Sequence, residues 1–125
     1  MGAEGYVYIP HECQNDAVKL TSDKHAEAKP CKLHVVLHGA MQNQERVQSA
    51  YAESTGYIEW AAANKIVLLF PKAADVPKFN PRAAWDFFGY TSRPGSGFTA
   101  GTYCTKQGVQ PRAIKGMVDR LMGEN

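Results

Sequence analysis

The residues that could take part in catalysis begin with His38-Gly39-Ala40, which follows an apolar run from Leu33 to Leu37. Where a strand gives way to a glycine turn, backbone N–H groups can be left free to point into a cleft. The transition state of acyl transfer carries a developing oxyanion, and one such donor contributes about 3 kcal/mol to its stabilisation. We therefore predict that the N–H of Ala40, helped by that of Met41, forms an oxyanion hole, and that Gly39 permits the close approach.

The sequence contains no recognisable pattern for the nucleophile that such a site requires. A hydrolytic serine often lies on a Gly-x-Ser-x-Gly turn between a strand and a helix. The serines Ser22, Ser49, Ser54, Ser92 and Ser96 all lie outside such a pattern. Ser96, within Pro94-Gly-Ser-Gly97, lacks the preceding strand and following helix, so a flexible turn is the preferred interpretation. The chain is not expected to hydrolyse an ester alone, and whether it is an enzyme stays open.

Two histidines belong to the same segment. His38 could act as a general base, but a histidine at the end of a strand beside a glycine turn more commonly braces the loop through hydrogen bonds. We expect His34, inside the strand, to be buried with its hydrogen bonds satisfied.

A second candidate segment, from Asn80 to Tyr90, gathers aromatic residues around one acid. These residues are Trp85, Phe87, Phe88 and Tyr90, with Asp86 among them. So many aromatic side chains on a loop indicate an apolar binding wall, or equally a cap over the core. Asp86 is expected to tie the loop to backbone N–H groups, and the role of a triad acid is the less favoured alternative.

The three cysteines indicate a disulfide. Cys13 and Cys31 flank a polar segment, residues 14–30, without apolar periodicity, and a bridge between them would contribute about 3 kcal/mol. It would favour an oxidising compartment and leave Cys104 unpaired. A metal site formed by His11, Cys13, His25 and Cys31 is a weak alternative, because the spacings match no zinc pattern.

Composition limits the classes of function. The chain has 125 residues, 44% hydrophobic and 21% charged, which suits one globular domain. A formal net charge of +2, with scattered basic residues, argues against a nucleic-acid partner. The longest apolar stretch, Ile66 to Phe70, is too short to span a membrane. The first residues lack the features of a signal peptide, so any secretion signal is expected upstream.

The elements that must position these residues follow an α/β pattern. Gly5–Ile9 and Ile66–Phe70 read as strands, and Lys32–His38 as a strand apolar on both faces, typical of a parallel sheet. Between them, Glu45–Glu53 and Tyr57–Lys65 show helical spacing, with Gly56 separating two short helices. The order predicts a right-handed βαβ crossover.

The rest of the chain is predicted to be one long loop and one helix. Residues 71–108 show no regular period, and loops of that length are usually functional. The last helix has Pro111 in its first turn and Gly123 as its stop. Two or three parallel strands leave open hydrogen-bonding edges, so we expect something else to pair with the sheet.

Taken together, these segments resemble the C-terminal part of poly(3-hydroxybutyrate) depolymerases and related esterases of the circularly permuted α/β-hydrolase type. The similarity covers nearly the whole chain: Gly5-Tyr-Val-Tyr-Ile-Pro10, Cys31-Lys-Leu-His-Val-Val-Leu-His-Gly39 with Gln42-Asn43, Thr55-Gly-Tyr-Ile-Glu-Trp-Ala61, Asn64-Lys-Ile-Val-Leu-Leu-Phe-Pro71, Asn80-Pro81, Trp85-Asp-Phe-Phe-Gly-Tyr90, Tyr103 with Thr105-Lys106, Gly108, Gln110 and the final helix.

The resemblance implies a partial α/β-hydrolase fold over residues 1–125, with the triad serine, aspartate and histidine in a preceding N-terminal portion. It implies that Ala40 offers the oxyanion N–H and that Trp85, Phe87 and Phe88 contact the ester chain. Family members resemble Trp-Asp-Trp-Trp where this chain has Trp85-Asp-Phe-Phe88. They usually carry cysteines at the positions of Ala40 and Ala84, and their joint absence indicates the loss of one disulfide and a looser loop.

We therefore expect the C-terminal portion of a serine esterase, with that N-terminal catalytic portion and a polyester or short ester as its partners. No cofactor, metal, nucleic acid or membrane is expected, and the family implies an extracellular or periplasmic location. The alternatives are a polyester-binding or interaction module without catalysis, and a truncated product that folds poorly.

Overall fold

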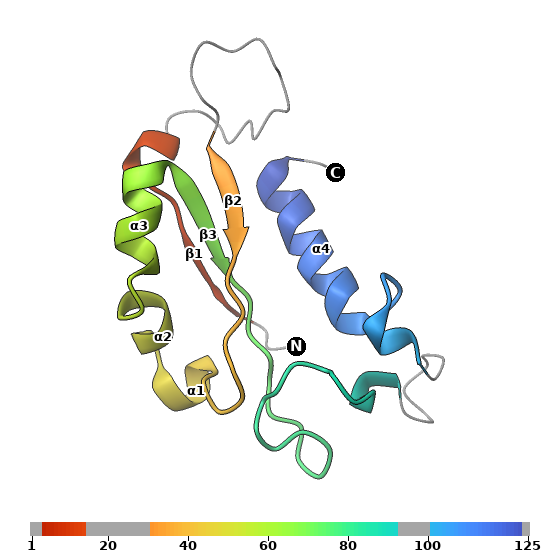
Figure 1. Ribbon diagram of the computed structural model, residues 1–125. Coiled ribbons are helices and arrows are strands. Elements are labelled where there is room, and N and C mark those ends of the chain that lie inside the picture. The colour runs from red at the N-terminus through yellow and green to blue at the C-terminus, as the bar shows by residue number, and fades with distance from the viewer. Residues whose placement is uncertain (1–3, 15–30, 93–100, 124–125) are drawn as a thin grey trace.

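The centre of the computed structural model, which describes residues 4–14, 31–92 and 101–123, is a mixed three-stranded sheet. Its strands are β1 (Tyr6–Tyr8), β2 (Lys32–Val35) and β3 (Ile66–Phe70), in the order β1-β3-β2 (Figure 1). β2 runs parallel to β3, as predicted, whereas β1 runs antiparallel to it. Of the two or three parallel strands predicted, the sheet therefore contains two, and its third strand is antiparallel.

The strand predicted to reach His38 ends earlier, at Val35. One further ladder bond, from the Val36 N–H to the Leu69 carbonyl, follows it. β3 is followed by Pro71, which has no N–H to continue the ladder. The residues after Val36 are thus released from the sheet, and this release frees the His38-Gly39 turn.

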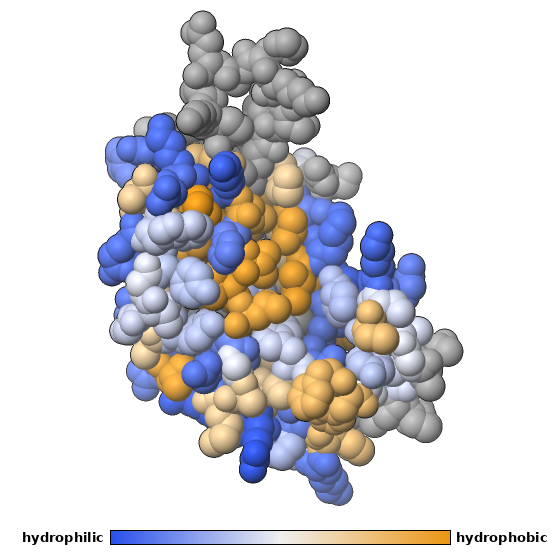
Figure 2. Space-filling view, in the orientation of Figure 1, coloured by the Kyte–Doolittle hydropathy of each residue, from blue (hydrophilic) through white to orange (hydrophobic). Residues whose placement is uncertain are grey.

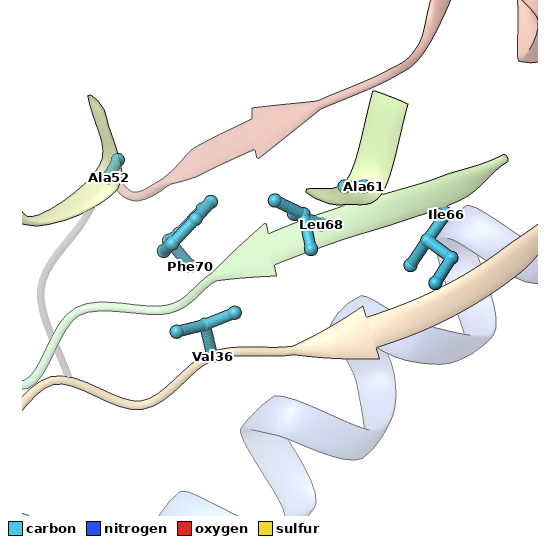
Figure 3. Close-up of a cluster of buried hydrophobic side chains, with 6 residues drawn as sticks. All are labelled: Val36, Ala52, Ala61, Ile66, Leu68 and Phe70. Atoms are coloured by element: carbon cyan, nitrogen blue, oxygen red, sulfur yellow. The ribbon is translucent and has the colours of Figure 1, made fainter. Parts of the chain in front are cut away.

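The crossover between β2 and β3 consists of three short helices, α1 (Gln44–Val47), α2 (Ala50–Glu53) and α3 (Tyr57–Asn64). Gly56, at φ 82°, takes the left-handed conformation that separates α2 from α3. These helices cover one face of the sheet, and the apolar core lies between the helices and the sheet (Figure 3). Its buried members are Val36, Ala52, Ala61, Ile66, Leu68 and Phe70.

The described residues between β3 and the last helix, 71–92 and 101–108, are mostly irregular, as predicted, and the last helix is α4 (Val109–Met122). The irregular part contains a tight turn closed by the bridge Val76–Asn80 and the 3₁₀ turns Tyr90–Ser92 and Thr102–Cys104. α4 packs against the second of these turns and lies on the opposite side of the sheet from α1–α3 (Figure 1). Gly123, at φ 72°, ends the helix in the left-handed conformation.

Both edges of the sheet are open within the described residues, because β1 and β2 each pair only with β3. Figure 2 shows a continuous hydrophobic patch in the centre of one face, where β2 and β3 run between α3 and α4. Leu37, just beyond β2, and Val7 of β1 are each almost half exposed, at 48% and 47%. An apolar sheet with uncovered edges normally has a partner. Among the described helices, none is long and apolar enough to cross a membrane.

Cys13 and Cys31 form a disulfide with their Cα atoms 6.0 Å apart, whereas Cys104 is free and exposed. The bridge joins the 3₁₀ turn His11–Cys13 to the residue before β2. The cysteines of the alternative metal site are therefore consumed, and its His25 lies outside the described residues. No cluster of three metal-ligating side chains occurs in the described parts of the chain.

Candidate active-site turn

In the tight turn Gly39–Gln42, which follows β2, one backbone N–H has no acceptor among the described residues. The Gly39 N–H donates to the Oε1 atom of Gln42 at 2.9 Å, and the Gln42 N–H donates to the Gly39 carbonyl at 3.2 Å. The Met41 N–H donates to the Arg82 carbonyl at 2.7 Å, so it cannot help Ala40 as predicted. Ala40 is exposed, and its N–H has no acceptor among the described residues. The turn therefore presents a single donor, from Ala40.

His38 is buried, and both of its ring nitrogens are occupied by backbone groups. The Ala73 N–H donates to Nε2 at 3.0 Å, so Nε2 must be unprotonated. Nδ1 lies 2.7 Å from the Gly39 carbonyl and must carry the proton. A general base needs a ring nitrogen that can reach the proton it removes. The arrangement thus favours the bracing interpretation of His38 over that of a base.

The aromatic loop contacts this turn directly through Trp85. The Trp85 Nε1–H donates to the His38 carbonyl at 2.9 Å, and the centroids of the two rings lie 5.3 Å apart. On another side, the ring of Tyr51 lies 6.3 Å from that of His38, and its hydroxyl donates to the Leu37 carbonyl at 2.9 Å. Trp85 therefore fixes the turn, a role that the sequence analysis did not assign to it.

Asp86 holds its own loop in place with four accepted hydrogen bonds. Oδ1 accepts from the Gly89 and Tyr90 N–H groups at 2.6 and 3.0 Å, and Oδ2 accepts from the Thr91 N–H at 2.9 Å and from the Thr91 hydroxyl. Burial raises the pKa of this carboxyl, but the bonds from Thr91, Gly89 and Tyr90 outweigh burial and hold the pKa below its ordinary 3.8. The carboxylate is thus committed to the loop and not to a histidine.

The aromatic residues of the loop divide into two pairs. Tyr90 is buried, its hydroxyl accepts from Gln110 at 2.6 Å, and burial raises its pKa. Phe87 and Phe88, by contrast, are 75% and 49% exposed, with their rings 5.0 Å apart. Tyr90 is thus turned inward, and Trp85 is half-buried against His38. Phe87 and Phe88 are the members of this group that can form a binding surface.

The two loops of the site are joined without the disulfide expected from the family. The main-chain bond from Met41 to Arg82 connects them, as does the bond from Trp85 to His38. The backbone of Ala84 is held from both sides by the side chain of Asn80, at 3.0 and 2.7 Å. Hydrogen bonds thus connect the loops next to Ala40 and Ala84, the two positions for which the family resemblance implied a disulfide in other members.

His34 is exposed, so the expectation that it is buried with its hydrogen bonds satisfied is wrong. It lies on β2, an edge strand, and its side chain makes no hydrogen bond within the described residues. Its ring contacts are with Tyr57 and Trp60, each centroid 5.8 Å away. Trp60 itself is 48% exposed. Whether a neighbouring element covers a strand at the edge of a sheet cannot be derived from the sequence of that strand.

Several residues that matter to the turn were quoted in the sequence motifs without a role. Gln42 holds Gly39, and buried Asn43 donates to the Ala73 carbonyl at 3.4 Å. Gln110 accepts from the Asp86 N–H at 2.6 Å and so ties α4 to the aromatic loop. Their dipeptide or single-residue matches were the only signal in the sequence. Asn43 and Gln110 act on partners 30 and 24 residues away, whereas Gln42 acts within its own turn.

No nucleophile stands beside this turn in the described residues. Ser92 is buried with its Oγ 3.2 Å from the Thr102 hydroxyl, and neither it, Ser49 nor Ser54 bonds to a histidine. Ser22 and Ser96 lie outside the described residues. Within the described residues, the site therefore offers a hydrogen-bond donor and an aromatic surface without an assembled nucleophile.

Two curated proteins are similar to this chain over nearly its whole length. Protein-family models gave no match. The chain is 38% identical over 121 residues to a poly(3-hydroxybutyrate) depolymerase of Delftia acidovorans, a match covering 97% of this chain and 20% of that protein. It is 32% identical over 127 residues to a polyhydroxybutyrate depolymerase of Talaromyces funiculosus, covering 98% and 33%.

Solved structures give the same result. A PHB depolymerase variant complexed with an R3HB trimer superposes with a TM-score of 0.70 at 27% identity, and the PHB depolymerase of Penicillium funiculosum with 0.69 at 26%. Each match covers 99% of this chain and 36% of the solved chain. The chain thus spans between a fifth and about a third of its relatives. Over its whole length, it is related in sequence and fold to one part of the polyhydroxybutyrate depolymerases.

Proposed function

We propose that this chain supplies the oxyanion donor and part of the substrate-binding surface of a serine esterase that hydrolyses poly(3-hydroxybutyrate) or related short hydroxyalkanoate esters. The observation that carries the proposal is the Ala40 N–H, which within the tight turn Gly39–Gln42 is the one N–H group without an acceptor among the described residues. In the reaction, a serine would attack the ester carbonyl, and the Ala40 N–H would stabilise the charge developing on the carbonyl oxygen. Water would then release the acyl group.

The substrate-binding part of the proposal rests on Phe87 and Phe88. The bond from Trp85 to His38 holds their loop beside the turn that carries Ala40. Two exposed aromatic rings next to an oxyanion donor suit an aliphatic ester chain, whose methyl and methylene groups pack against ring faces. Family members resemble Trp-Trp here, so the smaller rings of this chain would offer less contact area to each repeat unit.

The nucleophile, base and acid would come from the N-terminal catalytic portion expected from the family resemblance, docked at the open edge of β2. The N–H groups of Lys32 and Val36 point toward β3, so strand alternation turns those of Leu33 and Val35 toward the free edge. A strand pairing there would also cover exposed Trp60 and Leu37. The disulfide supports an extracellular or periplasmic location.

Reconstitution tests this function. The chain would be co-expressed with the part of the Talaromyces funiculosus relative that it does not match, and hydrolysis of a soluble 3-hydroxybutyrate oligomer would be measured. We expect turnover only when both parts are present, and none when the nucleophilic serine of the added part is replaced by alanine. A complex that forms but remains inactive with an intact serine would refute the proposal.

A matched variant tests the docking edge. Val35→Pro removes an N–H that points outward, a position at which an edge strand tolerates proline. We expect this variant to fold but to lose association with the added part. Val7→Pro, at the other edge of the sheet, serves as the control and should still associate.

The alternative function is a polyester-binding module without catalysis, favoured by the exposure of Phe87 and Phe88. It predicts that the chain binds poly(3-hydroxybutyrate) films by itself, and that adding the catalytic part produces no turnover. The two functions therefore differ in the outcome of the same reconstitution.

A further inference from the structure

The direction of the Ala40 N–H is set by the carbonyl of Gly39, because the two groups belong to one peptide unit. In a trans peptide the C=O and N–H bonds point in opposite directions, and the described chain contains no cis peptide. The Gly39 carbonyl is turned toward the buried ring of His38, whose Nδ1 donates to it at 2.7 Å, and it also accepts from the Gln42 N–H at 3.2 Å across the turn. The Ala40 N–H must therefore point outward, away from the core.

The position of the proton on Nδ1 of His38 is determined by a residue distant along the chain. Nδ1 of His38 can donate only while Nε2 of the same neutral ring is bare, and Nε2 is kept bare by the Ala73 N–H at 3.0 Å. Ala73 follows β3, is fully buried and is held on its carbonyl side by Asn43. The neutral Nδ1–H tautomer is thus selected by an N–H group from the segment that follows β3.

The ring has little freedom to escape this arrangement. His38 is 6% exposed and lies between Trp85 and Tyr51, whose ring centroids are 5.3 and 6.3 Å away. Trp85 also binds the carbonyl of His38, so the same side chain fixes both the ring and the peptide before Gly39.

The geometry points to His38 as a positioning residue: its Nδ1–H tautomer, selected by the Ala73 N–H, aims the Ala40 N–H at the oxyanion. This inference rests on the proposed function for its catalytic consequence, but the orientation itself is a property of this chain. His38 would move no proton during the reaction. Its effect would pass through the Gly39–Ala40 peptide.

Two substitutions separate the two ring nitrogens. In His38→Asn, the amide nitrogen occupies the place of Nδ1 and can still donate to the Gly39 carbonyl. In His38→Gln, the amide oxygen reaches the place of Nε2 and can accept from Ala73, but the donor to Gly39 is lost. A general base would be abolished by either change, whereas a positioning residue should be rescued in part by asparagine.

The first measurements use the chain alone. Imidazole ¹⁵N chemical shifts should show Nδ1 protonated and Nε2 bare. Backbone ¹⁵N relaxation should give the Ala40 N–H an order parameter of about 0.85 in the original chain, similar in His38→Asn and below about 0.6 in His38→Gln. A ring protonated on Nε2, or an Ala40 N–H equally ordered in both variants, would overturn the inference.

Kinetics of the reconstituted pair give the second measurement. Loss of one oxyanion donor lowers kcat about 100- to 1000-fold, so a misdirected donor in His38→Gln should lower it by roughly 10- to 100-fold with KM unchanged. His38→Asn should lose about tenfold less than His38→Gln. Equal losses in the two variants would contradict the positioning role.

The design distinguishes this inference from the proposed function. If reconstitution yields no activity while the tautomer and the order of Ala40 are as expected, the proposed function fails and the orientation stands. If His38→Gln does not fold, the ¹⁵N shifts of the original chain still decide the tautomer, and a protonated Nε2 refutes the inference.

Discussion

Replacing Asp86 by asparagine should destabilise the aromatic loop while leaving its shape almost unchanged. The asparagine oxygen can keep the bonds that Oδ1 accepts from the Gly89 and Tyr90 N–H groups. Its amide group cannot accept from Thr91, whose N–H now donates to Oδ2 at 2.9 Å. The variant therefore loses the two bonds that Oδ2 of Asp86 accepts from Thr91. Its amide N–H group would also face the Thr91 N–H, so that two donors oppose each other.

The expected cost follows from those losses. A hydrogen bond to a charged group contributes about 1.5–3 kcal/mol, and because Asp86 is only partly buried, water can replace part of the loss. We expect Asp86→Asn to lower the free energy of unfolding by about 2 kcal/mol at pH 7. Thr91→Val removes only the hydroxyl bond and should cost about 1 kcal/mol.

The pH dependence has a definite sign. The pKa of Asp86 is lower in the folded chain than its ordinary 3.8, so its contribution is complete above that value and is lost as the pH falls through the lower folded pKa. Urea unfolding followed by tryptophan fluorescence should therefore show a constant difference between Asp86→Asn and the original chain from pH 5 to 8. The difference should shrink only below about pH 3.8.

Equal stability of the two proteins at pH 7 would refute the reasoning that Asp86 serves the loop. So would a stability difference that disappears near neutral pH. A large loss of activity in the reconstituted enzyme without any loss of stability would instead restore Asp86 as a member of the catalytic machinery.

The remaining predictions concern the disulfide and the aromatic loop. Replacing both Cys13 and Cys31 by alanine should lower the free energy of unfolding by about 3 kcal/mol, measured by urea unfolding, and a reducing agent should then have no further effect. Trp85→Phe keeps the ring but removes the donor to His38, and should cost about 1 kcal/mol in the same assay. Phe87→Ala should change stability by less than about 0.5 kcal/mol, since Phe87 is 75% exposed, but should weaken binding to polyester films severalfold; unchanged film binding would exclude it from the substrate surface.

Much of the architecture was predictable because its signals are local. The apolar run Ile66–Phe70 forms β3 over those same residues, since an uninterrupted run ended by proline reads as a buried strand. Gly56 and Gly123 ended or separated helices through left-handed backbone that glycine adopts without strain. The pairing of Cys13 with Cys31 followed from the polar segment between them.

Other features were not predictable because they depend on partners distant along the chain. The direction of β1 is decided by how it meets β3, and a short strand carries no signal for parallel or antiparallel pairing. The exposure of His34 depends on β2 lying at an edge. The occupation of the Met41 N–H depends on Arg82, which comes from a different loop.

The sequence by itself determined the kinds of element, the disulfide, and the place where an oxyanion donor could lie, because hydrophobic periodicity, glycine and proline act over a few residues. Only the tertiary structure decided that, within Gly39–Gln42, the Ala40 N–H alone lacks an acceptor among the described residues, and that both ring nitrogens of His38 are taken up by backbone groups. Both results depend on Ala73, Arg82 and Trp85, which the fold brings to the turn from 35 or more residues away. A hydrogen bond requires a particular distance and direction, and composition carries neither.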